Sequence, residues 1–380
     1  MTVTPSPRQF ALCNCGFSRG PSPSPSPSPS PSRSPSPSLN RRGFLVGGAA
    51  ALALGAAASP GFMAEAVAET KPHRIDVHHH IAPPAWLDAL KSMKKDTPPV
   101  TNWSVQKTLD DMEAGGVATA MTSPTTPQLQ GLDAPTAARV AKESNEWAKK
   151  LEADHPGRFG TWAMLPLPHV DESLKAIEYA FDTLKVDGVG IMTSYGDKWL
   201  GYEEFEPVWK ELNRRKAIVY THPTGANCCV NLVRDVDEAY IEFGTDTTRS
   251  IFTIIFSSFA EKYPDINWIW SHGGGSITAF YERFTVQALT RPPYKGKFTR
   301  DRVEKQIRRF YYDTAAIPND ITLSALAKMV PVSQIVFGTD FPYRRAAEYG
   351  KPLAEFFKGQ DLEAVDRENA LRLVPRLRTS

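Results

Sequence analysis

From residue 71 onward, the chain alternates between short apolar runs and longer stretches in which apolar residues recur every three or four positions. The short runs predict eight strands, over residues 74–78, 117–122, 159–165, 188–192, 217–222, 266–272, 310–313 and 335–338. The longer stretches predict helices between them, over residues 104–114, 136–153, 172–184, 203–215, 248–263, 277–289 and 321–329. Eight strand–helix repeats in succession predict an α/β fold of the (β/α)8 (TIM) barrel class.

A doubly wound α/β sheet is the alternative that shares this alternation. It would hold the first and eighth strands far apart, and it predicts a glycine-rich phosphate loop directly after the first strand. That strand is followed instead by Ile81-Ala82-Pro83-Pro84. The triplet Gly273-Gly274-Gly275 matches no dinucleotide fingerprint, and we expect it to let the backbone pass close to a substrate. The barrel is therefore the preferred fold, with its active site at the C-terminal mouth.

Composition favours a small-molecule partner. The 380 residues are 41% hydrophobic, enough for one large catalytic domain, expected over residues 71–376. The formal net charge is +2, and no basic run interleaved with aromatic residues occurs outside the N-terminal region, so nucleic acid is not an expected partner. Cys13 and Cys15 lie in that region, and Cys228 and Cys229 are adjacent and poorly placed to bridge each other. Disulfides are not expected to hold this fold together.

The N-terminal region predicts export. Residues 1–38 end in a Pro/Ser-rich leader that cannot form a packed core and is expected to be disordered. Residues 39–68 combine Arg41-Arg42, an uncharged Ala/Gly-rich stretch and Ala66-Val67-Ala68, which is typical of a cleaved twin-arginine signal. The expected location is the periplasm with no permanent membrane span, or the cytoplasm if the leader is not functional. An uncleaved membrane anchor is the alternative. The length of the leader also suggests the hypothesis that the true start lies downstream of Met1.

Histidine and aspartate residues stand at four of the predicted strand ends. His78 and His80 close the first strand, and residues two apart in a strand point the same way, so this pair can bind one ion while His79 faces elsewhere. His222-Pro223, His272-Gly273 and Asp340-Phe341 follow the fifth, sixth and eighth strands. Because barrel strand ends meet at one mouth, we predict a mononuclear metal site there. His73, His155 and His169 are interpreted as turn residues.

The order His-x-His, His-Pro, His-Gly-Gly-Gly and Gly-Thr-Asp-Phe-Pro resembles the amidohydrolase superfamily. Within it, the chain looks like the aminocarboxymuconate-semialdehyde decarboxylase branch, which also holds γ-resorcylate and 6-methylsalicylate decarboxylases. The run Tyr311-Tyr312-Asp313-Thr314-Ala315 and the pair Trp103-Ser104 look most like the 6-methylsalicylate group.

The resemblance implies metal ligands and catalytic residues. It implies His78, His80, His222 and Asp340 as ligands, with His272, and Asp340 again, as catalytic residues. The sequence departs from the family pattern in two places, which bear on the substrate and on the number of metal ions. The segment Thr108-Leu109-Asp110 replaces the arginine that binds carboxylate in the muconate enzymes, and no lysine closes the fourth strand, so a second metal is not expected. One divalent ion is expected, and Zn or Mn suits these ligands.

Two reactions use the same residues. Through the family branch we favour a metal-dependent, non-oxidative decarboxylase of an aromatic or muconate-like carboxylic acid. The alternative is a metal-dependent hydrolase of a lactone, ester or amide that uses metal-activated water. A minor alternative is an exported metal- or solute-binding protein without turnover.

Four residues are candidates for holding the substrate, and one apolar stretch is a candidate partner surface. The substrate candidates lie at or just past strand ends, although each could equally be a solvated or ion-paired side chain: Arg283, Asp313, Tyr343 and Arg344. The apolar stretch 248–263 could cover a partner in a homodimer, or pack on its own barrel.

Overall fold

The computed structural model describes residues 73–378, so the proline–serine tract and the candidate export signal lie outside the described residues. Eight strands form one sheet in the order β1-β2-β3-β4-β7-β8-β9-β10, and every neighbouring pair is parallel. They are β1 (Arg74–His80), β2 (Val117–Ser123), β3 (Phe159–Met164), β4 (Gly188–Met192), β7 (Ile218–His222), β8 (Asn267–Trp270), β9 (Tyr311–Asp313) and β10 (Ile335–Val336). Their ends differ from the predicted ends by at most two residues.

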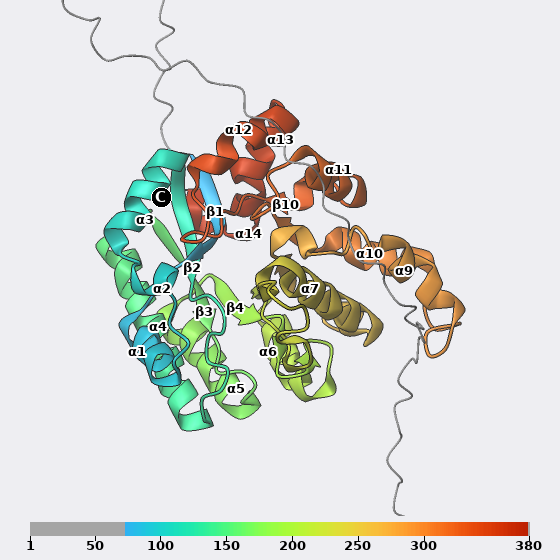
Figure 1. Cartoon of the computed structure of the whole chain (residues 1–380), viewed down its shortest axis with the longest axis horizontal. Helices are drawn as coiled ribbons and strands as arrows, with labels where there is room; N and C mark the ends of the chain where they lie inside the picture. The colour runs from blue at the N-terminus through green and yellow to red at the C-terminus, as the bar shows by residue number, and fades with distance from the viewer. Residues whose placement is uncertain (1–72, 379–380) are drawn as a thin grey trace, which may run out of the picture. The chain divides into compact units, whose positions relative to one another are not determined.

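Backbone hydrogen bonds join the last strand to the first. The N–H of Val77 donates to the carbonyl of Phe337 at 2.9 Å, and the N–H of Asp340 donates to the carbonyl of His78 at 2.8 Å. The N–H of His80 in turn donates to the carbonyl of Phe341 at 2.8 Å. The strands therefore close into a barrel, and Figure 1 shows helices arranged around it. The (β/α)8 prediction is confirmed.

Helices alternate with the strands and cover them from outside. They are α1 (Pro84–Met93), α2 (Pro98–Thr101), α3 (Val105–Gly115), α4 (Ala134–Asp154), α5 (Val170–Glu178), α6 (Glu206–Arg214), α7 (Glu238–Phe256), α8 (Phe259–Lys262), α9 (Tyr281–Thr285), α10 (Arg300–Arg309), α11 (Asp320–Met329), α12 (Ala347–Phe356), α13 (Gln360–Glu363) and α14 (Asn369–Leu373). A short antiparallel hairpin, β5 (Ser194–Tyr195) and β6 (Lys198–Trp199), follows β4.

Two helix predictions differ from the structure. The stretch 277–289 does not form one helix, because Val286 leaves the helical conformation between α9 and a 3-10 turn at Gln287–Thr290. The helix predicted over residues 248–263 in fact begins ten residues earlier, at Glu238. The side chain of Asp237 accepts a hydrogen bond from the Ala239 N–H and caps this end. The helix is then split, because Ser258 adopts a left-handed conformation with φ of 68°.

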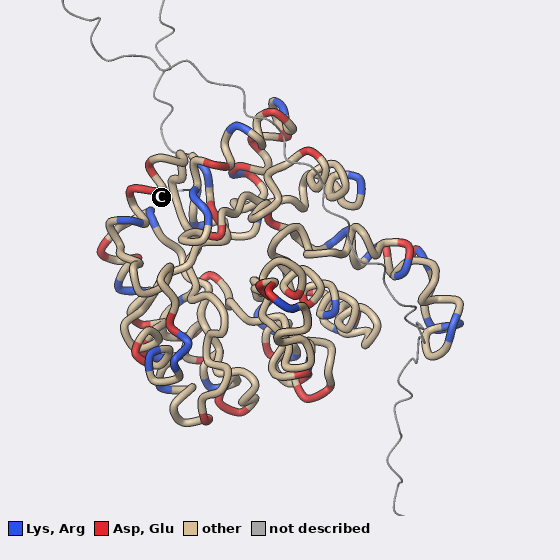
Figure 2. Tube along the Cα trace, in the orientation of Figure 1, with Lys and Arg blue, Asp and Glu red and all other residues tan. Residues whose placement is uncertain are grey.

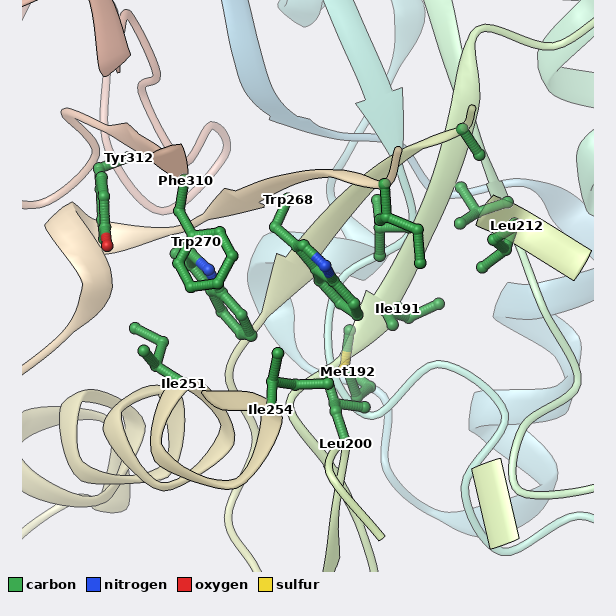
Figure 3. Close-up of a cluster of buried hydrophobic side chains, with 14 of the residues drawn as sticks. Ile191, Met192, Leu200, Leu212, Ile251, Ile254, Trp268, Trp270, Phe310 and Tyr312 are labelled. Carbon is green, nitrogen blue, oxygen red and sulfur yellow. The ribbon is translucent and has the colours of Figure 1, made fainter. Parts of the chain in front are cut away.

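The outer core lies between the strands and the surrounding helices. Figure 3 shows Trp268 and Trp270 of β8 pointing toward Ile251 and Ile254 of α7, and all four side chains are buried. Burying each such side chain contributes roughly 1.5–3 kcal/mol. The residues expected to cover a partner thus pack on the chain's own barrel, and a homodimer stays a prediction that these side chains do not support.

A second cluster fills the barrel interior. Strand residues such as Ile75, Trp162 and Tyr220 pack there against Ala370 and Leu371 of α14. Figure 2 shows acidic and basic segments interspersed along the described chain. Among residues 73–378, none of the helices combines the length and the apolar character that crossing a membrane requires.

Candidate metal centre

Four side chains converge at the C-terminal ends of the strands. His78 and His80 come from β1, His222 ends β7, and Asp340 follows β10; one ligand atom from each lies within 4.8 Å of the others. The Asp340 Oδ1 atom lies 3.1 Å from His80 Nε2, 3.2 Å from His78 Nε2 and 3.9 Å from His222 Nε2. Across residues 73–378, no other group of three or more His, Cys, Asp or Glu brings its ligand atoms this close.

The strand geometry separates His79 from this group, as the alternation predicts. The Nδ1 atom of His79 lies 3.0 Å from Asp76 Oδ2, and its ring stacks on Phe341 with 4.7 Å between centroids. Asp76 also accepts hydrogen bonds from the Thr339 N–H at 3.1 Å and the Thr339 hydroxyl at 2.6 Å. Asp76 therefore fixes the segment that carries Asp340, next to the strand that carries two of the histidines.

Each metal-facing histidine is oriented through its second ring nitrogen. The Nδ1 atom of His80 lies 3.2 Å from the Ser123 carbonyl, and that of His222 lies 2.8 Å from the Pro223 carbonyl. A carbonyl can only accept, so both Nδ1 atoms carry the proton and both Nε2 atoms present lone pairs. The His222 Nε2 atom is buried without a hydrogen-bond partner. A buried polar atom without a partner is costly, and a bound cation would satisfy it.

The charges also favour a cation. Burial alone would lower the pKa of His78, but the carboxylates of Asp313 and Asp340 outweigh burial and raise that pKa to about 10. Burial lowers the pKa of His80, and lowers the pKa of His222 to about 3. Burial opposes ionisation of Asp340, but the charge on His78 holds the pKa of that carboxyl well below its usual value. The neutral rings of His80 and His222 thus lie beside the ionised Asp340 carboxylate. The raised pKa of His78 shows that the same group of side chains favours a positive charge.

These residues fit one divalent ion. Three imidazoles and one carboxylate leave room for a further ligand, as a catalytic site requires, and the set suits Zn or Mn. Thr193 follows β4 where a bridging lysine would be needed for a second metal, and its side chain is fully buried. The geometry therefore supports a mononuclear centre.

His272 lies beside the four ligand candidates. Its Nε2 atom is 3.3 Å from Asp340 Oδ2, and its side chain is 14% exposed. Its backbone N–H donates a hydrogen bond to Asp313 Oδ1 at 2.8 Å. The glycines after it have a packing role: a Cβ atom on Gly275 would lie 2.2 Å from the Gly244 carbonyl oxygen of α7. Close packing on α7 thus requires glycine at position 275, and an approach of this backbone to substrate stays a prediction.

The substrate candidates occupy four different environments. The ring of Tyr343 lies 6.1 Å from that of His80, and Tyr343 is 43% exposed. Asp313 is fully buried behind His78, with its Oδ2 atom 2.8 Å from His78 Nδ1. Arg344 pairs with Glu348 at 2.7 Å, and Arg283 lines a groove beside α7 that includes none of the four ligand candidates. Of the four candidates, Tyr343 combines an exposed side chain with a position next to a ligand candidate.

Of the residues that support this centre, Asp313 was named from the sequence only as a substrate candidate, and the others were not named. Asp76 is the one that carried a signal, since it is an acidic residue within the apolar run Ile75-Asp76-Val77. The acceptors of His80 and His222 are backbone carbonyls, for which no side chain gives a signal. Of the histidines interpreted as turn residues, His73 lies 3.3 Å from Asp366 and His169 lies 2.9 Å from the Leu132 carbonyl, both outside the metal group.

The family follows from comparison with known proteins. The profile of the family described as Amidohydrolase (Amidohydro_2) matches residues 75–376. This chain belongs to the amidohydrolase family. The amidohydrolase is 34% identical over 327 residues to decarboxylase yanB of Aspergillus niger, covering 80% of this chain and 88% of that protein. It is 32% identical over 325 residues to the 6-methylsalicylic acid decarboxylase acuB of Aspergillus aculeatus, covering 80% and 97%.

Solved structures agree on the fold. A crystal structure of an amidohydrolase II protein superposes with a TM-score of 0.74 and 26% identity, covering 80% of this amidohydrolase and 99% of that chain. The manganese-bound dihydroxybenzoic acid decarboxylase of Polaromonas sp. JS666 superposes with a TM-score of 0.71 and 18% identity, covering 80% and 97%. At that lower identity the likeness concerns the barrel alone.

Proposed function

We propose that this amidohydrolase is a metal-dependent, non-oxidative decarboxylase of a hydroxylated aromatic carboxylic acid. The observation that carries the proposal is the three-histidine, one-aspartate group with His272 held against Asp340 at the barrel mouth. Relatives that are 32–34% identical over most of their length and named as decarboxylases support the choice of reaction.

The ion and the protein have separate tasks. His78, His80, His222 and Asp340 would hold one divalent cation, which would supply a Lewis acid to polarise the substrate. His272 and Asp340 share a short contact through Nε2 and Oδ2, so a proton can be held between them. Delivery of that proton to the ring carbon, followed by cleavage of the carbon–carboxyl bond, yields the arene and carbon dioxide. The His78, His80 and His222 side chains are buried, whereas those of His272 and Asp340 are each 14% exposed.

The favoured substrate class is a 2-hydroxybenzoate such as 6-methylsalicylate. A hydroxyl next to the carboxylate offers two oxygens to one ion, and the named function of the Aspergillus aculeatus relative supports this class. A muconate-like acid is less favoured, because the start of α3 offers the buried Thr108 where a carboxylate-binding arginine would be needed. Tyr343, beside His80, is placed to contact the substrate ring.

A paired assay tests the reaction. The purified protein, with its metal content determined, is offered hydroxybenzoates while carbon dioxide is followed, and a lactone and ester panel while acid is followed. Carbon dioxide release that stops with chelator, and in the Asp340→Ala and His272→Ala variants, is expected. His272→Ala should keep its metal, because His272 is not one of the four ligand candidates. Acid release without carbon dioxide would instead establish a hydrolase, and metal binding without any turnover would establish a binding protein.

We also propose manganese or zinc as the ion, and export through the twin-arginine signal at residues 39–68. Manganese in the dihydroxybenzoic acid decarboxylase structure supports the first. Arg41-Arg42 and Ala66-Val67-Ala68 support the second. Elemental analysis followed by reconstitution of the apoprotein with each metal tests the ion. N-terminal sequencing of the protein from the periplasmic fraction tests export, and an intact N-terminus found only in the cytoplasm would contradict it.

A further inference from the structure

A buried carboxylate on α7 is connected to the metal centre by hydrogen bonds without belonging to it. Asp246 is 0% exposed, and it is not among the four ligand candidates. Three side-chain donors converge on its carboxylate: the Thr193 hydroxyl, the Ser194 hydroxyl at 2.9 Å and the Trp199 indole N–H at 2.6 Å. Asp246 therefore ties α7 to the segment that follows β4.

Thr193 carries this connection to a metal ligand. Its backbone N–H donates to the carbonyl of His222 at 2.9 Å. Its own carbonyl accepts a hydrogen bond from the Ser250 hydroxyl, one turn further along α7. Thr193 is thus held by α7 on one side and holds the backbone of His222 on the other.

The ring of His222 depends on that backbone. Its Nδ1–H donates a hydrogen bond to the carbonyl of the adjacent residue, Pro223, at 2.8 Å. A displacement of the backbone at 222–223 therefore moves the ring and its acceptor together. The same stretch of α7 also supports the His272 loop, because the Ser276 N–H donates to the Gly244 carbonyl at 3.1 Å and to the Thr248 hydroxyl at 3.0 Å.

The helix can serve as a fixed support because it is itself packed firmly. Figure 3 shows Ile251 and Ile254 of α7 against the indoles of Trp268 and Trp270, and all of these side chains are buried. Side chains in such a core occupy single, well-packed positions. A hydrogen bond from this helix therefore transmits a defined position to its partner.

We propose that Asp246 is a positioning residue of the metal centre, which acts through Thr193 to fix the backbone of His222. The proposal rests on the proposed function only in assigning a metal to the four ligand candidates. It requires a carboxylate rather than an amide, because three donors face this side chain. An asparagine would offer one oxygen and turn its NH2 group toward a donor, leaving buried polar atoms unpaired.

Four variants test the proposal by metal affinity, measured as Mn²⁺ dissociation constants from competition with a chelator. Asp246→Asn and Thr193→Val each break one link of the chain, whereas Thr193→Ser keeps the hydroxyl. Loss of a residue that orients a metal ligand typically weakens binding about 10- to 100-fold. We expect that loss for Asp246→Asn and Thr193→Val, and an affinity within about threefold of the unmodified protein for Thr193→Ser. Both substitutions act on one path, so their effects should not add. The double variant Asp246→Asn/Thr193→Val should bind Mn²⁺ at most about threefold more weakly than the single variant with the lower affinity.

Asp366→Asn is the matched control, because Asp366 is also a buried carboxylate but pairs with Arg74, at 3.1 Å, at the other end of β1. Asp366→Asn should lower the stability of the protein against urea and leave its Mn²⁺ dissociation constant within about twofold of that of the unmodified protein. If Asp246→Asn behaves in the same way, the proposal is overturned. If Asp246→Asn fails to fold, the near-isosteric Thr193→Val decides by the same criterion. Because Mn²⁺ binding is measured without any substrate, a missing decarboxylase activity would leave this test intact.

Discussion

The Nδ1 atom of His78 lies 2.8 Å from Oδ2 of Asp313, and both side chains are fully buried. The other oxygen of Asp313 accepts the backbone N–H of His272 at 2.8 Å and that of Ala315 at 3.0 Å. Asp313→Asn would turn an NH2 group toward one of these donors. We expect Mn²⁺ affinity and turnover to fall about 10- to 100-fold, because His78 loses its fixed orientation. Chelator competition measures this loss, and an unchanged dissociation constant would remove Asp313 from the supporting residues.

Metal binding should release a proton. In the metal-free protein the pKa of His78 is about 10, raised above its ordinary value by Asp313 and Asp340 against the effect of burial. His78 is therefore protonated at pH 7, while the lowered pKa values of His80 and His222 keep those rings neutral. An ion can bind His78 only after this proton leaves, so about one proton should be released per Mn²⁺. Affinity should then rise about tenfold per pH unit from pH 6.5 to 8.5, since deprotonation becomes easier as pH rises.

Calorimetric titrations in two buffers of different ionisation enthalpy measure the released protons. Equal apparent enthalpies in both buffers would show that no proton leaves, and would contradict the assigned charge state of His78.

Gly338 should not tolerate a side chain. A Cβ atom there would lie 2.9 Å from the Cβ atom of His78 and 3.1 Å from that of Asp313. Overpacking of this kind costs about 1–3 kcal/mol, so Gly338→Ala should lower the melting temperature by roughly 2–8 °C and weaken Mn²⁺ binding. Gly350→Ala in α12 is the control, because the nearest atoms there are the flexible end of Arg74. Equal effects of the two substitutions on Mn²⁺ affinity would contradict the prediction.

The Cys228 thiol should react slowly. The Cys228 and Cys229 sulfur atoms lie 2.7 Å apart, and the hydrogen bond to Cys229, with burial second, raises the pKa of Cys228 to about 12. Only the thiolate is nucleophilic, so at pH 8 Cys228 should be alkylated by iodoacetamide on the order of 100-fold more slowly than in the Cys229→Ala variant. Peptide mass spectrometry with fragment ions that locate the label follows both rates. Equal rates would show that Cys229 does not hold the Cys228 proton.

The sequence predicted the barrel and a metal site at its mouth because both follow from local periodicity, whereas the family resemblance implied which residues are the ligands. Strands alternate with period two, and His78 and His80 therefore face the same way. Strand ends of a barrel meet at one mouth, which brought His222 and Asp340 to the same place without any knowledge of distance.

Features that depend on tertiary packing escaped prediction. The helix α10 was missed because its sequence is strongly charged, and Val303 and Ile307 are its only buried apolar residues. Asp246 lies in a polar stretch of α7 that predicts a solvent-facing surface, yet it is fully buried under the β5–β6 hairpin residue Trp199. Arg283 was expected just past a strand end, but it lies in α9 and lines a groove beside α7. Such placements depend on how helices meet neighbouring loops, which periodicity does not encode.

The fate of the carboxylate carbon distinguishes decarboxylation from hydrolysis. 6-Methylsalicylate labelled with ¹³C at the carboxyl group is incubated in D2O with the metal-loaded protein, and the products are followed by NMR and mass spectrometry. We expect labelled carbon dioxide in equal amount to 3-methylphenol that carries one deuterium at the former carboxyl position, and no reaction after chelation or in Asp340→Ala. Unchanged 6-methylsalicylate, together with metal-dependent acid release from its methyl ester, would contradict a decarboxylase and assign the centre to hydrolysis.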